Sequence, residues 1–230
     1  MLKRFLNILL VYIPLGFVVL SLSLVMLYKW VPVKWTPLML KRTIENVGNK
    51  DYRNKQVWTD IEEISPKMIQ AVLASEDGRF LEHHGFDFKE LKKMKRDHDY
   101  YGKKIRGCST ISQQVAKNCF TWCSRTWVRK AFEAYYTILI EVFWDKERIM
   151  EVYLNVAETG RGLFGVEAAS WEYFGISSSQ LTLSDAVGVA CCLPKPLART
   201  PDVVSLTMPK HKATIAKRAS MTPFNLKQNK

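Results

Sequence analysis

Two carboxylates in the middle of the sequence stand among the residue types that proton abstraction and phosphate departure require. Glu76 ends a run of apolar residues at helical spacing, and Glu133 follows Arg129 and Lys130. A carboxylate on a buried helical face loses hydration, which raises its pKa and makes it a better proton acceptor near neutral pH. Fixed cations beside a departing pyrophosphate stabilise the charge that grows in the transition state. These residues predict a site that takes up a proton and stabilises a phosphate leaving group.

Each carboxylate also has a purely structural explanation. Glu76 could lie at the rim of its apolar stripe and pair with Arg79 or with a lysine. Arg129 and Glu133 are four residues apart, a spacing that gives ordinary ion pairs on helix surfaces. Periodicity alone does not choose between these explanations and a chemical role.

Three blocks of sequence surround the two carboxylates. Residues 76–87 read Glu-Asp-Gly-Arg-Phe-Leu-Glu-His-His-Gly-Phe-Asp. Residues 107–118 are rich in hydroxyls and amides and end in Lys-Asn, and residues 129–134 read Arg-Lys-Ala-Phe-Glu-Ala. A polar loop that leads into a helix N-terminus can hold anions through backbone N–H groups, and it can also be a simple helix cap.

In this order and spacing, the three blocks resemble the peptidoglycan glycosyltransferase family, and in particular its members without a transpeptidase domain. The resemblance covers roughly residues 55–200, and two weaker blocks at 149–155 and 162–175 extend it as scaffold. It implies a mainly α, lysozyme-like glycosyltransferase domain with a large lobe and a small membrane-facing jaw near residues 80–107. No Ser-x-x-Lys occurs, so the serine acyl-enzyme motif of a transpeptidase is absent.

The resemblance also implies an activity, which is the polymerisation of lipid II into glycan strands with inversion at the anomeric carbon and release of polyprenyl pyrophosphate. Glu76 matches the catalytic base, which removes the proton of the acceptor's sugar 4-hydroxyl. Glu133 matches the second essential carboxylate, which organises the donor site directly or through a bound cation or water. The substrate-binding positions that the resemblance implies are Lys117, Arg125, Arg129, Lys130, Ser109, Thr110, Gln113, Gln114, Asn118, Asp77, Phe80 and His83.

The resemblance implies no required cofactor and no protein metal ligands, and it leaves room for a divalent cation, Mg or Mn, near the donor pyrophosphate. Two residues depart from the family pattern. Cys108 stands where the family usually has Gly or Ala, and Arg161 stands where it often has an acidic or neutral residue. Because a thiol is small, we expect the loop at Cys108 to keep its shape.

The net charge of +12 suggests an anionic partner, which could be nucleic acid, an acidic lipid surface or a phosphorylated substrate. A generally basic surface is the simpler alternative. A membrane segment in the same chain favours lipid headgroups and lipid-linked phosphates. The aromatic residues do not interleave with the basic run as in a recognised nucleic-acid module, so we expect no nucleic-acid partner.

Residues 5–28 carry no charge, and about twenty such residues cross a bilayer as a helix. No clear cleavage site follows, which predicts one uncleaved transmembrane anchor. Basic residues lie on both sides of the segment, so charge does not settle its orientation. The resemblance implies a single-pass protein of the bacterial inner (cytoplasmic) membrane, with its catalytic domain on the outer (periplasmic) side.

The remaining chain of about 190 residues is enough for one domain. We expect an N-terminal stub and anchor over 1–30, a linker over 31–54, the glycosyltransferase domain over 55–201 and a basic tail over 202–230. The tail is either poorly ordered or a surface helix. Helical patterns begin at Ser65–Pro66 and at about 109, 126 (after a Ser124 cap), 146, 166 and 184 (opened by Thr182 or Ser184).

Residues 88–106 carry eight Lys or Arg against three acids, which predicts a mobile basic segment. The five cysteines include no C-x-x-C pair, which argues against a disulfide framework and a structural zinc site. Cys119 and Cys123 could pair in an oxidising compartment, whereas Cys191 and Cys192 lie in an apolar run typical of a core.

Two other functions fit part of the pattern. A lysozyme-like glycan-cleaving enzyme also uses paired carboxylates in an α fold, but it has no need of cations at a leaving pyrophosphate. A non-catalytic, membrane-anchored scaffold of the cell wall could be equally basic, but it would not require both Glu76 and Glu133. The expected partners are lipid II, the lipid-linked glycan strand, the membrane and other proteins of cell-wall synthesis or division.

Overall fold

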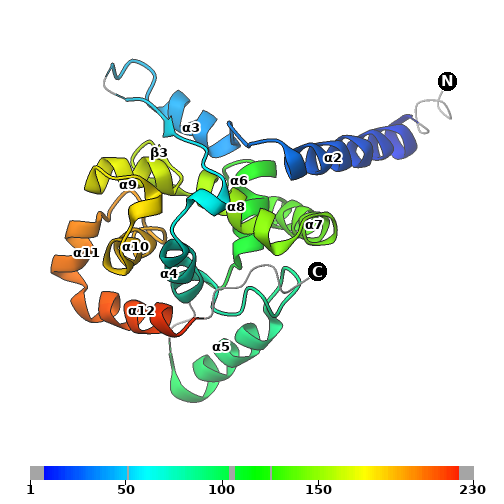
Figure 1. The fold of residues 1–230 in the computed structure, drawn as a ribbon. Coiled ribbons are helices and arrows are strands. Elements are labelled where there is room, and N and C mark those ends of the chain that lie inside the picture. The colour runs from blue at the N-terminus through cyan, green and yellow to red at the C-terminus, as the bar shows by residue number, and fades with distance from the viewer. Residues whose placement is uncertain (1–7, 51, 104–106, 125, 223–230) are drawn as a thin grey trace.

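The structure, a computed structural model, describes residues 8–50, 52–103, 107–124 and 126–222. Over these residues the chain is mainly helical, as expected, with one small sheet (Figure 1). The helical elements are η1 Ile8–Tyr12, α2 Ile13–Trp30, α3 Pro37–Glu45, η2 Ile61–Glu63, α4 Pro66–Glu76, α5 Phe88–Tyr101, α6 Ile111–Phe120, α7 Trp127–Phe143, α8 Lys146–Val156, α9 Val166–Phe174, η3 Ser178–Gln180, α10 Leu183–Ala190, α11 Pro201–Thr207 and α12 Pro209–Met221. The strands are β1 Lys55–Gln56, β2 Glu158–Gly160 and β3 Leu163–Phe164.

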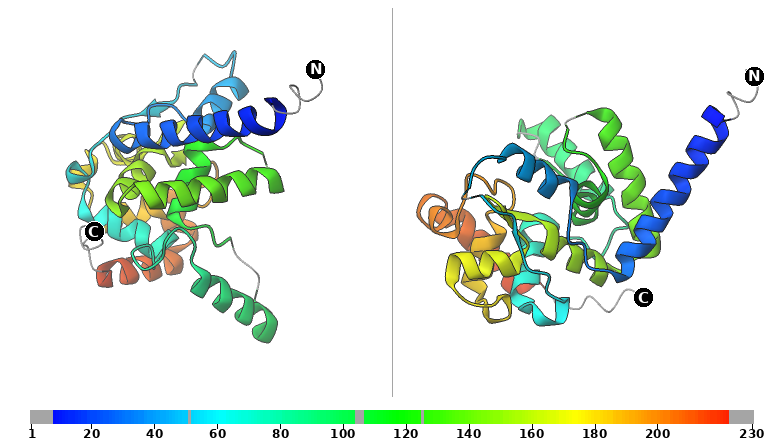
Figure 2. Two further views of the ribbon diagram at one scale, coloured as in Figure 1. Left: turned by 90° about the vertical axis from the view of Figure 1, so that its right-hand side faces the viewer. Right: turned by 90° about the horizontal axis from the view of Figure 1, so that it is seen from above.

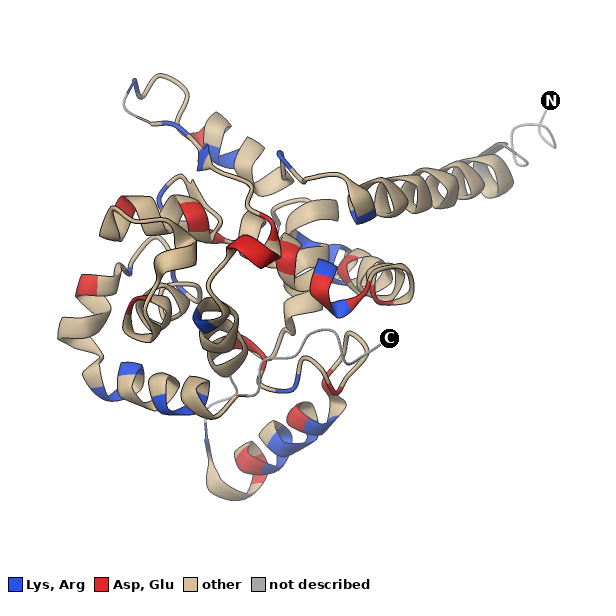
Figure 3. Cartoon of the chain, viewed as in Figure 1, with Lys and Arg blue, Asp and Glu red and all other residues tan. Residues whose placement is uncertain are grey.

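The N-terminal apolar segment forms a helix that projects from the body of the protein, with the N-terminus at its far end (Figures 1 and 2). The run Leu10–Trp30 is 21 residues long and is apolar enough to cross a membrane. Charged side chains are absent along α2 until Lys29, near its C-terminal end (Figure 3). The length and composition of this helix therefore agree with the expected anchor.

The anchor helix does not stand free of the domain, because it packs along α7 (Figure 2). The rings of Phe17 and Phe132 lie 5.5 Å apart between centroids, and the hydroxyls of Ser21 and Tyr135 are 2.7 Å apart. Further along, Trp144 Nε1 donates to the carbonyl of Val25 at 2.8 Å. These contacts fix the anchor to the domain through ring packing and hydrogen bonds.

The core forms around α4, which packs against α10 and α12 (Figure 1). Pro66 occupies its first turn, as predicted, and Met68, Ile69 and Val72 are fully buried. Ser65 holds the N-cap position, but its hydroxyl donates to the carbonyl of Leu181 and does not cap the helix. The apolar spacing thus places α4 in the core and brings Glu76 to its last position.

The basic C-terminal stretch is helical over Pro201–Met221, which matches the helix alternative of the prediction. Val204 and Ile215 are buried, and α12 covers α4 and α10. Basic residues are spread along α12 (Figure 3), and Lys210, Lys217 and Arg218 are exposed. These two helices therefore share the core of the domain that was expected to end at residue 201.

Residues 88–101, expected to be a mobile basic segment, form the helix α5. Asp87 Oδ1 accepts from the backbone N–H of Glu90 at 2.9 Å and caps the helix, and Gly102 ends it with a φ of +61°. Good helix formers and two end signals outweigh the repulsion between like charges. α5 buries none of its residues and stands away from the core (Figure 1).

The expected start of α7 was also misplaced, since Thr126 and not Ser124 caps this helix: its hydroxyl accepts from the N–H of Arg129 at 3.2 Å. Thr182 caps α10, which was one of the two alternatives.

The cysteines are all free, including Cys119 and Cys123, and the core placement of Cys191 and Cys192 is confirmed.

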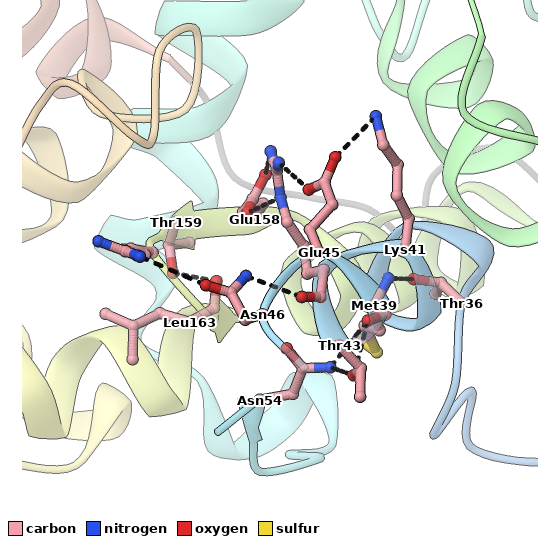
Figure 4. A network of polar contacts seen from close by, with 12 residues as sticks. Thr36, Met39, Lys41, Thr43, Glu45, Asn46, Asn54, Glu158, Thr159 and Leu163 are labelled. Atoms are coloured by element: carbon pink, nitrogen blue, oxygen red, sulfur yellow. Dashed lines mark hydrogen bonds and ion pairs between the residues drawn. The ribbon is translucent and has the colours of Figure 1, made fainter. Parts of the chain in front are cut away.

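Part of the expected linker is the helix α3, which a polar network ties to the small sheet (Figure 4). The sheet has the order β1-β3-β2, with β1 parallel and β2 antiparallel to β3. Arg42 donates from Nε and Nη2 to the two carboxylate oxygens of Glu158 at 2.8 and 2.9 Å. Arg161 donates to Asn46 Oδ1 at 3.3 Å, so it joins the network on this side of the fold.

A buried ion pair joins the helices α6, α7 and α8. Lys146 Nζ on α8 donates to Glu141 Oε1 on α7 at 2.8 Å, and the side chains are 7% and 6% exposed. The hydroxyl of Ser112 on α6 donates to the same carboxylate oxygen. Lys146 Nζ also lies 4.4 Å from the ring centroid of Phe80. Because both charges are desolvated, each depends on the other.

We expect Glu141→Ala to lower the free energy of unfolding by about 3–5 kcal/mol, because it leaves the Lys146 ammonium buried without a partner. Chemical denaturation in detergent, followed by circular dichroism, measures the loss. The control is Glu172→Ala, which removes the exposed partner of Lys55 and should cost less than about 1 kcal/mol. Equal losses in the two variants would contradict the role of the buried pair.

Candidate active site

The predicted base, Glu76, is half-buried at the C-terminal end of α4. Its Oε2 accepts from Gln114 Nε2 on α6 at 2.9 Å, and Ser75 Oγ lies 3.5 Å from Oε1. Burial raises the pKa of Glu76; the hydrogen bonds from Gln114 and Ser75 and the charge of Arg199 oppose the shift, whereas Asp77 adds to it. The carboxylate therefore has the environment of a proton acceptor.

The structural explanation of Glu76 as a partner of Arg79 is wrong. Arg79 Nε donates to Glu82 at 2.9 Å, and its Nη1 lies 3.3 Å from Asp87. Neither contact involves Glu76, which has no ion pair in the part of the chain that the structure describes. The charge of Glu76 is thus not neutralised by an ion pair with a described residue.

Three predicted binding residues of the first block have partners inside the protein. Both oxygens of Asp77 lie 3.0 Å from His83 Nε2, and Oδ2 also accepts from the N–H of Ile111 at 3.0 Å. Phe80 is 1% exposed and its ring meets that of His83 edge-on. The structure therefore places Asp77, Phe80 and His83 as supports of the turn that follows Glu76.

Gly85 closes this turn against α7. Its φ is +85°, and a Cβ at this position would lie 2.8 Å from Thr137 Cγ2, too close for any side chain. Its carbonyl accepts from Thr110 Oγ1 at 2.7 Å, which joins the first block to the second. The tight glycine thus lets two segments of the site meet.

The second block begins α6 with a reciprocal cap. Thr110 Oγ1 accepts from the N–H of Gln113 at 3.2 Å, and Gln113 Oε1 accepts from the N–H of Thr110 at 3.0 Å. Gln113 and Asn118 are buried, whereas Gln114 faces Glu76. Thr110 and Gln113 therefore serve as a helix cap, which was one of the two explanations of this block. Gln114 is the amide that contacts the predicted base, Glu76.

The second carboxylate, Glu133 on α7, is 3% exposed in its side chain and is held by two cations. Arg129 Nη1 lies 2.5 Å from Oε2, and Lys130 Nζ pairs with Oε1. Lys130 Nζ also lies 3.5 Å from Ser109 Oγ, which brings the second and third blocks together. The ion pair between Arg129 and Glu133 that the spacing predicted is present. The carboxylate of Glu133, however, is buried and is shared between Arg129 and Lys130.

Helix α6 connects the two carboxylates. Gln114 touches Glu76, and Lys117, about one turn further along, interacts electrostatically with Glu133. Lys117 Nζ makes no hydrogen bond or ion pair with any residue that the structure describes, so its charge is available to a ligand. Arg125, the other predicted pyrophosphate contact, lies outside the described residues.

The residues around Glu133 do not fit a metal ion held by the protein. No cluster of three or more His, Cys, Asp or Glu exists among the described residues. Both oxygens of Glu133 are engaged by Arg129 and Lys130. Mg²⁺ in phosphate sites usually needs one or two free carboxylates.

Residues 41–221 match the family described as Transglycosylase. The chain belongs to the transglycosylase family. Proteins called biosynthetic peptidoglycan transglycosylase are similar to it over most of their length. The one from Chromohalobacter salexigens is 47% identical over 188 residues, which cover 81% of this chain and 80% of the relative. The one from Bdellovibrio bacteriovorus is 50% identical over 181 residues (78% and 72%), and that from Rhodospirillum centenum is 41% identical over 206 residues (90% and 87%).

These matches confirm the family and the reaction class expected from the three blocks. The transglycosylase match extends from α3 to the end of α12, so it includes helices on both sides of the expected domain boundaries. The sequence analysis did not single out Arg199, whose charge opposes the rise in the pKa of Glu76. Arg199 donates to the carbonyl of Cys191 at 3.0 Å, at the end of α10 next to Ser75.

We expect this transglycosylase to lose its polymerisation activity on acidification at a pH above the usual pKa of a glutamate side chain. Glu76 must be ionised to accept a proton, and burial raises its pKa above the usual value of about 4.3. The rate should therefore be present above the raised pKa and be lost as the pH falls through it. The rate of lipid II consumption against pH measures this limb, with circular dichroism as a check on folding. A limb at or below the usual value would contradict the assignment.

We expect Glu133→Gln to lower the polymerisation rate by about 10²–10³-fold, because Arg129 and Lys130 lose the charge that fixes them. Initial rates at several lipid II concentrations measure the effect. Glu172→Gln, on the exposed side of α9, is the matched control and should retain normal activity. A normal rate in Glu133→Gln would show that the ion-paired cluster does not serve the reaction.

Proposed function

We propose that the chain is a membrane-anchored glycosyltransferase that joins lipid II units into glycan strands. The donor is the growing strand, linked at its reducing end to polyprenyl pyrophosphate, and the acceptor is one lipid II molecule. The observation that carries the proposal is that α6 connects the cation cluster at Glu133 with Glu76, a carboxylate that makes no ion pair with any described residue. A glycan-cleaving enzyme has a neutral leaving group after protonation and needs no such cluster.

On the acceptor side, Glu76 removes the proton of the sugar 4-hydroxyl. The oxygen forms a bond to the anomeric carbon of the donor while the bond to the pyrophosphate breaks, and the pyrophosphate leaves with the electron pair. Attack opposite the leaving group converts the α linkage to a β linkage. The raised pKa of Glu76 suits this step because a stronger base takes the proton more readily.

On the donor side, Lys117, Arg129 and Lys130 stabilise the negative charge that develops on the pyrophosphate. Glu133 acts by fixing Arg129 and Lys130 in place before substrate arrives. Preorganised charges need no rearrangement during the reaction, which is where their catalytic value lies. Arg125 is expected to join them.

We further propose that the short N-terminus lies on the cytoplasmic side of the bacterial inner membrane and that the domain lies on the outer, periplasmic side. The anchoring is supported by α2, which is long and apolar enough to cross the bilayer and is fixed to α7, whereas the orientation follows from the family resemblance. Because α7 also carries Glu133 and its two cations, the anchor holds the donor site near lipid-linked phosphates. Partner proteins of cell-wall synthesis or division stay a prediction.

The deciding test is incubation of the purified full chain in detergent with labelled lipid II, followed by gel separation of the products. Wild type should give long strands, and Glu76→Gln should give none while remaining folded, a loss of at least about 10²–10⁴-fold. Glu172→Gln should behave as wild type. Near-normal polymer from Glu76→Gln would remove this residue from the mechanism, and strand shortening by wild type would favour a glycan-cleaving enzyme.

A further inference from the structure

The side-chain amide of Gln114 is held at both of its ends. Its Nε2 donates to Glu76 Oε2 at 2.9 Å, and its Oε1 accepts from the hydroxyl of Tyr153 at 3.4 Å. Tyr153 lies on α8 and is 1% exposed. A chain of two hydrogen bonds thus runs from the core of the domain to the base.

The direction of this chain follows from the donors and acceptors. An ionised carboxylate only accepts hydrogen bonds, so it requires the NH₂ end of Gln114 to face it. An amide turned the other way would set its carbonyl oxygen against Glu76, which is tolerated only when the glutamate carries a proton. The hydroxyl of Tyr153 donates to Oε1 and so selects the orientation that an ionised Glu76 needs.

The tyrosine is suited to this task. Burial and the charges of Glu76 and Asp77 raise the pKa of Tyr153 well above its usual value, so the hydroxyl keeps its proton over the working range of pH. The other titratable or charged groups that interact with Glu76 are Asp77, Cys191 and Arg199. Among these three groups and Tyr153, only Tyr153 is connected to Glu76 through a hydrogen-bonded amide.

We propose that Tyr153 is a positioning residue for the base: through Gln114 it orients the carboxylate of Glu76 and favours its ionised form. The inference rests on the proposed function, in which Glu76 accepts the proton. It assigns Tyr153 a role beyond the core packing expected from its sequence block. It also makes Gln114 a contact of the base, in addition to the substrate contact expected from the resemblance.

The test is the pair Tyr153→Phe and Tyr173→Phe in the full chain. Each removes one hydroxyl from a protein hydrogen bond, since Tyr173 Oη donates to the carbonyl of Thr159 at 3.1 Å, away from Glu76. We expect Tyr153→Phe to lower kcat by about tenfold, the effect of one lost hydrogen bond on a rate, with an unchanged KM for lipid II. The acidic limb of its rate profile should move to higher pH. Tyr173→Phe should retain both kcat and the limb.

Identical kcat and identical limbs in the two variants would overturn the proposal. A double-mutant cycle provides an independent check, because Tyr153→Phe should add nothing in a Gln114→Leu background if Tyr153 acts through Gln114. Additive losses would also overturn it. If Tyr153→Phe does not fold, Gln114→Leu alone must shift the acidic limb of the pH–rate profile to higher pH. An unchanged limb would exclude the positioning role of Tyr153 and Gln114. Polymer from wild type establishes the proposed function separately, so its failure is distinguishable from failure of this inference.

Discussion

The buried carboxylate of Asp77 is the contact on which the rest of the site depends. It joins the turn after α4 to the first turn of α6, through His83 on one side and the N–H of Ile111 on the other. A buried charge is costly unless it is hydrogen-bonded, and a helix N-terminus is a favourable place for an anion. Because Glu76 precedes Asp77 and Gln114 lies one turn into α6, this single contact sets the base and its amide partner in register.

The two functional carboxylates have opposite surroundings. Glu76 meets an amide, a hydroxyl and the more distant charge of Arg199, and burial raises its pKa. Glu133 is almost fully buried between Arg129 and Lys130. Environments that differ in this way assign different roles to chemically identical groups. In the proposed reaction, Glu76 takes the proton, and Glu133 holds the positive charge that stabilises the departing pyrophosphate.

The sequence predicted the parts of this site that depend on local spacing. Apolar periodicity placed Glu76 at the end of a core helix, and the four-residue spacing placed Arg129 beside Glu133. Contacts between distant segments were beyond its reach. The pairing of Tyr153 with Gln114 depends on how α8 crosses α6, and strands of two or three residues carry no alternating pattern.

Charge also misled the sequence-based interpretation. The lysines of residues 88–101 suggested a mobile segment, yet Asp87 and Gly102 supply the end signals of α5. The burial of Asp77 and His83 was likewise invisible, since polar residues in a motif are equally consistent with substrate contacts and with internal support. In both cases the role of a polar residue depends on the group that it contacts, and only the fold determines that group.

The attachment of α2 to α7 gives the enzyme a fixed relation to bilayer thickness. A bilayer thicker or thinner than the apolar run Leu10–Trp30 is accommodated by tilting the helix or by deforming the lipid around it. Since Phe17, Ser21 and Val25 are bound to the domain, a tilt of the anchor turns the domain with it. In the proposed reaction, lipid chain length therefore changes the angle at which Glu133 and its cations meet the pyrophosphate, without any contact between those lipids and the site.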